Sequence, residues 1–260
     1  MQVILFSAVA GIGGTGLGGL VSVTLLRRSS DNMMCFLLSF AAGIMISIVC
    51  FGLIPESIAI SGIVISISGL MLGVVIIMIL NRVVDKVTAA KDESHKLHHT
   101  HEELYHESHI IEGRVKMLRS GMIMLIAIGL HNIPEGIAIG AGGSYDFQLG
   151  VLLSIMIALH NIPEGMAIAA PLLAGGISKW KVVFLTALSG ALTPLGGLAG
   201  MIIGSISEFT VALALSAAGG AMLYVVFGEI VPQTIVMTKT RAVTLVTLFG
   251  MIVGLLITKI

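Results

Sequence analysis

Eight apolar stretches constrain the fold of this chain more than any other feature. They cover residues 3–26, 34–56, 62–84, 117–141, 148–174, 181–205, 209–232 and 242–259. About 20 apolar residues in an α-helix are enough to cross the hydrocarbon core of a bilayer. Only 11% of the 260 residues are charged, whereas soluble domains have about 25%. The sequence therefore predicts an all-α membrane protein with eight transmembrane helices.

The basic residues predict the orientation of these helices. Of the 14 Lys and Arg residues, 13 belong to the first, third, fifth and seventh connections, and only Lys259 lies on the opposite side. Lys and Arg are enriched in the cytoplasmic loops of membrane proteins. We therefore expect a multi-pass protein of the cell membrane (plasma or inner membrane), with both termini outside.

Two weak internal repeats predict how the helices are arranged. Residues of the second stretch recur in the seventh at an offset of 177, and residues 15–20 resemble residues 193–198. Because the members of each pair are five stretches apart, they cross the membrane in opposite directions. This pattern predicts an inverted repeat, in which stretches one to three and six to eight surround the antiparallel pair four and five. Inverted repeats are common in secondary transporters.

The fourth and fifth stretches share a polar hexapeptide, His-Asn-Ile-Pro-Glu-Gly, at residues 131–136 and 160–165. Residues i and i+4 lie on one helix face, so each copy presents an imidazole and a carboxylate together. A carboxylate at the centre of a membrane helix costs about 2.5–3.5 kcal/mol, whereas interhelical polar contacts average only about 0.6 kcal/mol. A divalent cation would neutralise both carboxylates. The predicted primary ligands are His131, Glu135, His160 and Glu164.

The donor atoms indicate the class of metal. Two imidazoles and two carboxylates suit four-coordinate Zn²⁺. They also suit Fe²⁺, Mn²⁺, Co²⁺ and Cd²⁺, so ligand type alone does not choose the metal. No organic cofactor is expected. The zero net charge and the lack of a basic block argue against nucleic acid as a partner. No nucleotide-binding motif is present, so ATP coupling within this chain is not expected.

The third connection, residues 85–116, is the only long one. It is polar and mixed in charge, so we expect it to be largely disordered. His-rich tracts can bind metal, and we predict metal capture or sensing here. The alternative is a solvated tether between two helical bundles. Its histidines are His95, His98, His99, His101, His106 and His109.

With these features the chain resembles the ZIP family of zinc- and iron-regulated-transporter-like divalent metal transporters, in a bacterial-type branch. The resemblance covers the whole chain and rests on the eight stretches, the external termini, the His-rich connection and both HNIPEG motifs. It implies a transporter, not an enzyme, that moves divalent metal into the cytoplasm. It also implies a homodimer, a rocking or elevator-like movement of the motif helices, and a second metal position that uses Asn132 and Asn161.

One position departs from the family pattern. Many relatives have a glutamate just before the proline of the sixth stretch, where this chain has Thr193. A hydroxyl is neutral and is a weaker ligand than a carboxylate. We therefore expect Asn132, Asn161 and Thr193 to form a weak secondary position, which leaves one tight site in place of two.

Two further acids lie near the ends of apolar stretches. Glu56 follows Pro55 at the outer end of the second stretch, and Glu229 lies near the cytoplasmic end of the seventh. The inverted repeat places them at opposite mouths of the pathway, so we predict that Glu56 receives metal and Glu229 helps to release it. The alternative for either acid is that its side chain extends to the membrane interface and has no role in transport. Trp180, at an inner boundary, is typical of an interfacial anchor.

These predictions divide the chain into four parts. They are a first three-helix arm at 1–84, the cytoplasmic loop at 85–116, the metal-site helix pair at 117–174 and a second arm at 181–260. A membrane-embedded metal-dependent hydrolase is the alternative function, because a metal held by His and Glu can activate water. The chain has no HExxH or nucleophile motif to support it. Export is a further possibility, because ligand chemistry does not set the direction of transport.

Overall fold

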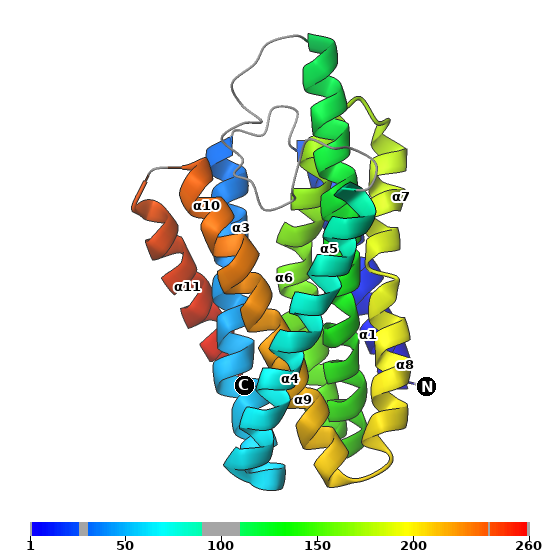
Figure 1. Cartoon of the computed structure of the whole chain (residues 1–260), viewed down its shortest axis with the longest axis vertical. Coiled ribbons are helices and arrows are strands. Elements are labelled where there is room, and N and C mark those ends of the chain that lie inside the picture. Colours follow the sequence, from blue (N-terminus) through cyan, green and yellow to red (C-terminus); the bar gives the residue numbers. More distant parts are fainter. Residues whose placement is uncertain (1, 26–30, 90–109, 239, 259–260) are drawn as a thin grey trace.

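The computed structural model describes residues 2–25, 31–89, 110–238 and 240–258. Within these residues it contains helices and turns and no strand, which confirms the predicted all-α class (Figure 1). In chain order the helical segments are α1 (Gln2–Ala8), η1 (Val9–Gly13), α2 (Gly14–Leu25), α3 (Asp31–Ser47), η2 (Ile48–Leu53), α4 (Ile54–Ala89), α5 (Ile110–Tyr145), α6 (Phe147–Ala174), α7 (Lys179–Ser189), α8 (Leu192–Gly204), α9 (Glu208–Val225), η4 (Val226–Ile230), α10 (Val231–Met237) and α11 (Ala242–Ile257). The three η segments are short stretches of π-helix.

Six segments of the described chain are long and apolar enough to cross a membrane. They are Gln2–Thr24, Cys35–Leu80, Met117–Tyr145, Phe147–Ala174, Lys179–Gly204 and Glu208–Ile230. The eighth predicted stretch corresponds to α11, which is apolar but has only 16 residues. The multi-pass membrane character is therefore clear, although the second and third predicted stretches fall within one segment.

Gly62 divides that segment in two. Its φ of 80° and ψ of 168° are not helical, and a positive φ of this kind favours glycine, which has no Cβ. In Figure 1 the chain turns back at the lower end of the bundle between α3 and the long arm of α4. The sequence predicted the end of the second stretch at residue 56, whereas helical geometry continues to Gly62. Apolar composition locates the hydrocarbon-spanning part of a helix, and the turn requires glycine.

The first and sixth predicted stretches are both interrupted near their middles. η1 separates α1 from α2, while α7 ends at Ser189, with Gly190 as its C-cap, and α8 begins at Leu192. The interruptions touch, because a Cβ on Gly11 would collide with the carbonyl oxygen of Gly190. Two backbones can approach this closely only where small residues face each other. The apolar pattern of the sequence does not indicate where these two interruptions lie.

The helices pack in pairs at other small residues. α2 lies against α6, where a Cβ on Gly18 would collide with the carbonyl oxygen of Ile162. α8 lies against α5, where a Cβ on Gly196 would collide with the carbonyl oxygen of Ile133. In the same way α3 packs against α11, and α4 packs against α9. These contacts enclose α5 and α6 and hold the hexapeptides inside the bundle.

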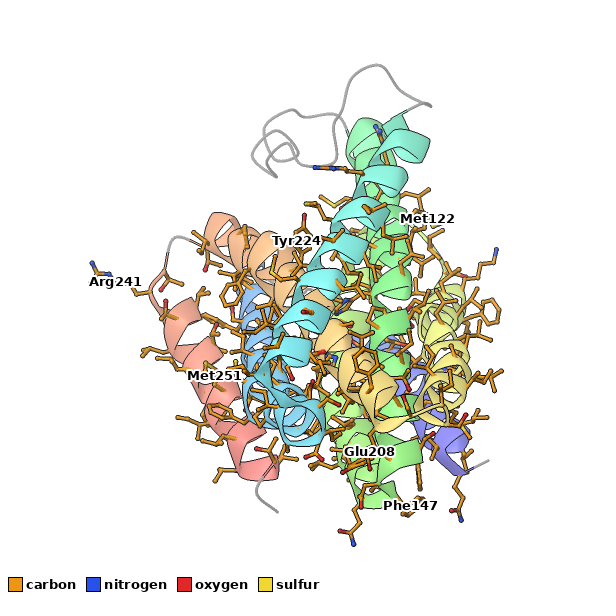
Figure 2. The ribbon with its side chains drawn as sticks, turned by 60° about the horizontal axis from the view of Figure 1, so that its bottom comes forward. Met122, Phe147, Glu208, Tyr224, Arg241 and Met251 are labelled. Carbon is orange, nitrogen blue, oxygen red and sulfur yellow. The ribbon has the colours of Figure 1, made fainter. Side chains whose placement is uncertain are left out.

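The ends of the helices agree with alternate crossing of a membrane. Figure 2 shows Phe147, at the start of α6, and Glu208, at the start of α9, toward the same end of the bundle. The connections before these two helices contain no Lys or Arg. α5 and α6 continue through Pro134 and Pro163 without a break in helical assignment. Proline alone therefore does not interrupt the helices that carry the motif.

Candidate metal centre

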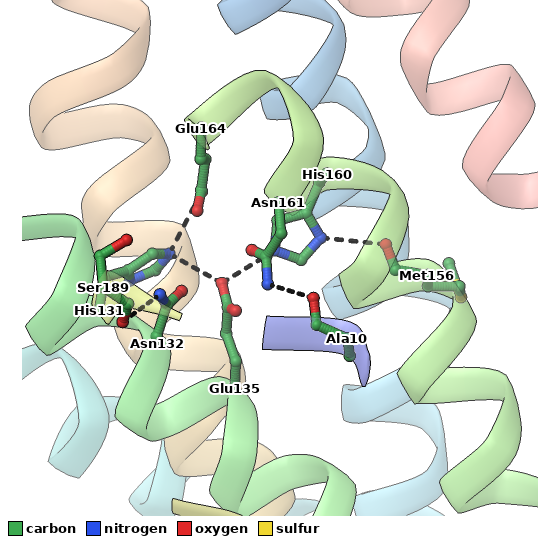
Figure 3. Close-up of polar contacts among 9 residues, drawn as sticks. All are labelled: Ala10, His131, Asn132, Glu135, Met156, His160, Asn161, Glu164 and Ser189. Atoms are coloured by element: carbon green, nitrogen blue, oxygen red, sulfur yellow. Dashed lines mark hydrogen bonds and ion pairs between the residues drawn. The ribbon is translucent and has the colours of Figure 1, made fainter. Parts of the chain in front are cut away.

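The two hexapeptides lie on adjacent helices at the centre of the bundle. α5 carries His131 and Glu135, and α6 packs against it and carries His160 and Glu164. All four residues are buried, none being more than 3% exposed. Figure 3 shows the four side chains pointing toward one another between the helices. The structure therefore brings together the residues that the repeated motif singled out.

Glu135 occupies the middle of this group. Its Oε1 atom lies 2.8 Å from His160 Nε2 and 3.3 Å from His131 Nε2. Glu164 Oε1 lies 3.9 Å from His131 Nε2. One donor atom from each of His131, Glu135 and Glu164 lies within 4.8 Å of the others. His160 is not one of these three residues. It contacts them through its hydrogen bond to Glu135.

The separations can be compared with those in a coordination shell. Ligand atoms about 2.0–2.2 Å from a tetrahedral ion are roughly 3.4 Å apart. The 3.3 Å between His131 Nε2 and Glu135 Oε1 matches this value, and the 3.9 Å to Glu164 needs only a small side-chain movement. The 2.8 Å contact of His160 is a hydrogen bond and must open for an ion to bind both partners.

The orientation of the His160 ring is determined by the backbone. Its Nδ1 atom lies 3.1 Å from the carbonyl oxygen of Met156, four residues earlier on α6. A carbonyl oxygen only accepts hydrogen bonds, so Nδ1 carries a hydrogen and Nε2 faces Glu135. A backbone or carboxylate partner on the second ring nitrogen is typical of histidines that bind metal. His160 is therefore held in the orientation that a ligand needs.

The two asparagines join the motif helices to the interrupted helices. Asn132 Nδ2 donates to the carbonyl oxygen of Ser189, the last residue of α7, at 3.0 Å. Asn161 Nδ2 donates to the carbonyl oxygen of Ala10, within η1, at 3.1 Å. The Ala10 carbonyl also accepts from the backbone N–H of Gly14, so the contact of Asn161 adds to a helical hydrogen bond. The Oδ1 atom of each asparagine has no hydrogen-bond partner in the described structure.

Several buried nitrogen and oxygen atoms around the two motifs have no hydrogen-bond partner in the described structure. A buried polar atom without a partner costs about 1–3 kcal/mol, and native proteins contain few of them. His131 Nε2 is near Glu135, but the contact does not have hydrogen-bond geometry. The unpaired atoms are both ring nitrogens of His131, Oδ1 of Asn132 and Asn161, Oε2 of Glu135 and Glu164, and Oγ1 of Thr193. A cation would satisfy such a set of acceptors.

Thr193 lies beside the second interruption. It is the second residue of α8 and is fully buried. A Cβ on Gly11 would collide with its hydroxyl, and Gly11 follows Ala10, the η1 residue whose carbonyl accepts from Asn161. The predicted secondary group of Asn132, Asn161 and Thr193 is therefore built around the two interruptions.

The predicted pathway acids occupy different surroundings. Glu229 lies in η4, is half-buried, and is close enough to Glu164 for their like charges to interact. Glu56 lies in the first turn of α4, is also half-buried, and is not part of the central cluster. The six predicted loop histidines, His95 to His109, lie outside the described residues. Their metal binding remains a prediction.

Sequence reasoning missed the backbone partners of the site. The i−4 carbonyl of Met156 could have been found from helical spacing, because it lies one turn before His160. The carbonyls of Ser189 and Ala10 could not, since they depend on where two distant helices are interrupted. No local signal around either asparagine indicates these contacts.

Comparison with known proteins gives a consistent result. Residues 81–260 match the family model described as ZIP zinc transporter. The chain is 32% identical over 228 residues to the zinc transporter ZupT of Chlorobaculum parvum, with 84% of this chain and 82% of that relative covered. It is 29% identical to ZupT of Akkermansia muciniphila, with 100% and 96% covered. A match at 42% identity to zinc transporter ZIP11 of Xenopus tropicalis covers 51% of this chain and 41% of that relative.

Proposed function

The chain belongs to the ZIP zinc transporter family, and on this premise we propose that it carries divalent transition-metal ions through the bilayer into the cytoplasm. Zn²⁺ is the favoured substrate, and Fe²⁺, Mn²⁺, Co²⁺ and Cd²⁺ are chemically compatible with the same donors. The family consists of metal-ion transporters, so the prediction that the chain is not an enzyme is confirmed. The hydrolase alternative is not favoured.

The observation that carries this proposal is the buried cluster on α5 and α6. Two carboxylates and two imidazoles lie together within helices that are long and apolar enough to cross a membrane. A buried carboxylate without compensation is costly in hydrocarbon, and a divalent ion supplies that compensation. In this proposal His131, Glu135, His160 and Glu164 bind the ion on its way through the protein.

Transport itself provides the test. Purified protein is reconstituted into liposomes that contain a zinc-sensitive fluorophore, and Zn²⁺ is added outside. We expect the wild type to give a rapid signal and the Glu135→Ala/Glu164→Ala double variant to give none. Glu208→Ala is the matched control, because Glu208 is an exposed acid at the start of α9. Normal flux in the double variant would place the pathway elsewhere.

We further propose that one ion is bound tightly and that the secondary position is weak. The secondary group offers the oxygens of Asn132, Asn161 and Thr193, all without a hydrogen-bond partner, but these side chains are neutral. Calorimetric titration of Zn²⁺ into purified wild type should therefore give one tight ion per chain.

The substitution Thr193→Glu sharpens this proposal. It adds a carboxylate at the start of α8, so we expect a second ion to bind in the same calorimetric titration. Thr193→Val, which keeps the shape without the hydroxyl, should still bind one ion. Two equally tight ions in the wild type would show that the hydroxyl is a sufficient ligand and would overturn the single-site proposal.

The proposed architecture is eight spans arranged as an inverted repeat around α5 and α6. The contacts of Gly18 with Ile162 and of Gly196 with Ile133 support it, because the glycines are 178 residues apart and the isoleucines 29 apart. These are the offsets of the sequence repeats. η2 and η4 also fall at matching positions of the second and seventh stretches, which supports the same arrangement.

The remaining parts of the pathway follow from this arrangement. We assign entry to Glu56 and release to Glu229, and the charge interaction of Glu229 with Glu164 supports the second assignment. The His-rich loop faces the cytoplasm, the termini face outward, and the chain functions as a homodimer in the bilayer. The parts 1–84, 85–116, 117–174 and 181–260 serve as first arm, loop, metal-site pair and second arm.

Metal selectivity is best tested by competition. We expect excess Fe²⁺, Mn²⁺, Co²⁺ or Cd²⁺ to reduce Zn²⁺ uptake into the same liposomes, because each ion suits the His and Glu donors. Mg²⁺ should not compete, because it prefers oxygen ligands in octahedral geometry. Uptake that responds to Mg²⁺ as strongly as to Cd²⁺ would contradict transport through a site with imidazole ligands.

A further inference from the structure

A hollow of about 420 Å³ opens on the surface between the last turn of α2 and the first turn of α7. Its lining consists of Leu20, Val23, Thr24, Lys179 and Trp180. None of these residues belongs to a hexapeptide or to the metal cluster. No role in metal binding accounts for it.

The hollow lies at a membrane boundary. The first candidate span ends at Thr24, and the fifth of the six candidate spans begins at Lys179. Two segments that belong to different parts of the chain thus reach the edge of the hydrocarbon together. Trp180 is 77% exposed, and tryptophan is enriched at the level of lipid headgroups. A ligand in this hollow would be in contact with lipid, and its rim would be in contact with water.

The lining combines an apolar part from α2 with a cationic residue from α7. Leu20 and Val23 form an apolar surface along α2, and the exposed Lys179 lies at the start of α7. Ser178, the residue before α7, provides no side-chain hydrogen bond to cap the helix. The positive end of a helix and a lysine favour the same kind of group, an anion. An amphiphile with an anionic headgroup satisfies both parts of the lining, whereas a free anion leaves the apolar surface exposed.

We propose that this hollow binds an anionic phospholipid, with its headgroup phosphate at Lys179 and its acyl chains along Leu20 and Val23. In the proposed topology this lipid belongs to the cytoplasmic leaflet. The lipid would connect the two interrupted stretches, because α2 belongs to the first and α7 to the sixth. Both helices pack against α6, and α7 also packs against α5. The inference concerns binding at the surface and does not depend on which metal is transported.

Trp180 makes the proposal directly testable, because it is the only tryptophan of the chain and it lines the hollow. The protein is reconstituted into bilayers that contain phosphatidylglycerol or phosphatidylcholine, each brominated on acyl carbons close to the headgroup. Bromine quenches tryptophan fluorescence at short range. We expect phosphatidylglycerol to reach half-maximal quenching at about fivefold lower mole fraction than phosphatidylcholine. That preference corresponds to roughly 1 kcal/mol, the order of magnitude for one lysine at an anionic surface.

Two variants and one competitor test whether Lys179 causes the preference for phosphatidylglycerol. Lys179→Gln should remove the fivefold preference, while Lys181→Gln should keep it, because Lys181 is exposed and equally charged but does not line the hollow. Unchanged Zn²⁺ uptake by Lys179→Gln verifies that this variant is folded. Equal quenching by both lipids in the wild type, or equal loss in both variants, would overturn the proposal. Displacement of phosphatidylglycerol by excess inorganic phosphate would overturn it in favour of a free anion.

Discussion

The two copies of the hexapeptide have the same sequence and different surroundings. His160, on α6, donates from Nδ1 to the Met156 carbonyl and contacts Glu135 at 2.8 Å. His131, on α5, has no hydrogen bond at either ring nitrogen in the described structure. The acids differ in the opposite sense, because Glu135, in the first copy, lies within 4 Å of both histidines, and Glu164, in the second copy, lies within 4 Å only of His131. One pair, His160 and Glu135, is therefore held together across the two copies, whereas the other pair, His131 and Glu164, has ligand atoms without a hydrogen-bond partner in the described structure.

This difference shows how one site can bind an ion and release it. The His160 ring is oriented by the Met156 carbonyl before the ion arrives, which reduces the ordering cost of binding, although its hydrogen bond to Glu135 must open for an ion to bind both residues. His131 and Glu164 are farther apart, at 3.9 Å, and are the residues that must move toward the ion. We infer that capture and release involve mainly these two side chains.

The largest expected effect comes from the acid that both histidines share. Glu135→Ala should weaken Zn²⁺ binding by roughly 100-fold or more, because it removes a ligand that holds both histidines. Glu164→Ala should weaken it by about tenfold, at the lower end of the range for groups that support a metal site. Calorimetric titration of the two variants side by side measures this ratio. Equal losses would mean that the two acids are equivalent and that the asymmetry of the structure has no energetic consequence.

The next effect distinguishes the histidines in protein without metal. His160→Ala leaves Glu135 without its hydrogen-bond partner inside the bundle, and an unpaired buried group costs about 1–3 kcal/mol. His131→Ala removes no hydrogen bond. We therefore expect a lower apparent melting temperature for His160→Ala only, measured in chelator-treated detergent solution. A larger loss of stability in His131→Ala would reverse the comparison.

The smallest expected effect is a loss of stability that should be equal for the asparagines of the two copies. Asn132 and Asn161 each donate one hydrogen bond to a carbonyl of an interrupted helix, at 3.0 and 3.1 Å. Replacement of either by alanine should reduce stability by about 0.5–1.5 kcal/mol, the net contribution of one such bond. Thermal unfolding of both variants in the same detergent checks this expectation. A loss confined to one asparagine would show that only one interruption is held by the motif.

Much of this arrangement could be predicted from residues alone. The apolar pattern places the helices, and the repeated hexapeptide identifies His131, Glu135, His160 and Glu164 as a group. The asymmetry within the group could not be predicted, because the hexapeptides are identical and each histidine has a carbonyl four residues earlier. The contacts of neighbouring helices, such as α2 and α3 against α6, produce the difference. The turn at Gly62 and the interruption at Gly190 also depend on packing, because glycine is common throughout these helices.

X-ray absorption at the zinc edge, on protein loaded with one equivalent of Zn²⁺, tests the central claim most directly. The account predicts an ion with two imidazole ligands and oxygen ligands, one imidazole being lost in His131→Ala and one in His160→Ala. The chelator-treated variants should retain their helical circular dichroism, which separates loss of a ligand from loss of fold. A wild-type spectrum without imidazole, or spectra unchanged in both variants, would contradict a shared site formed by the two hexapeptides.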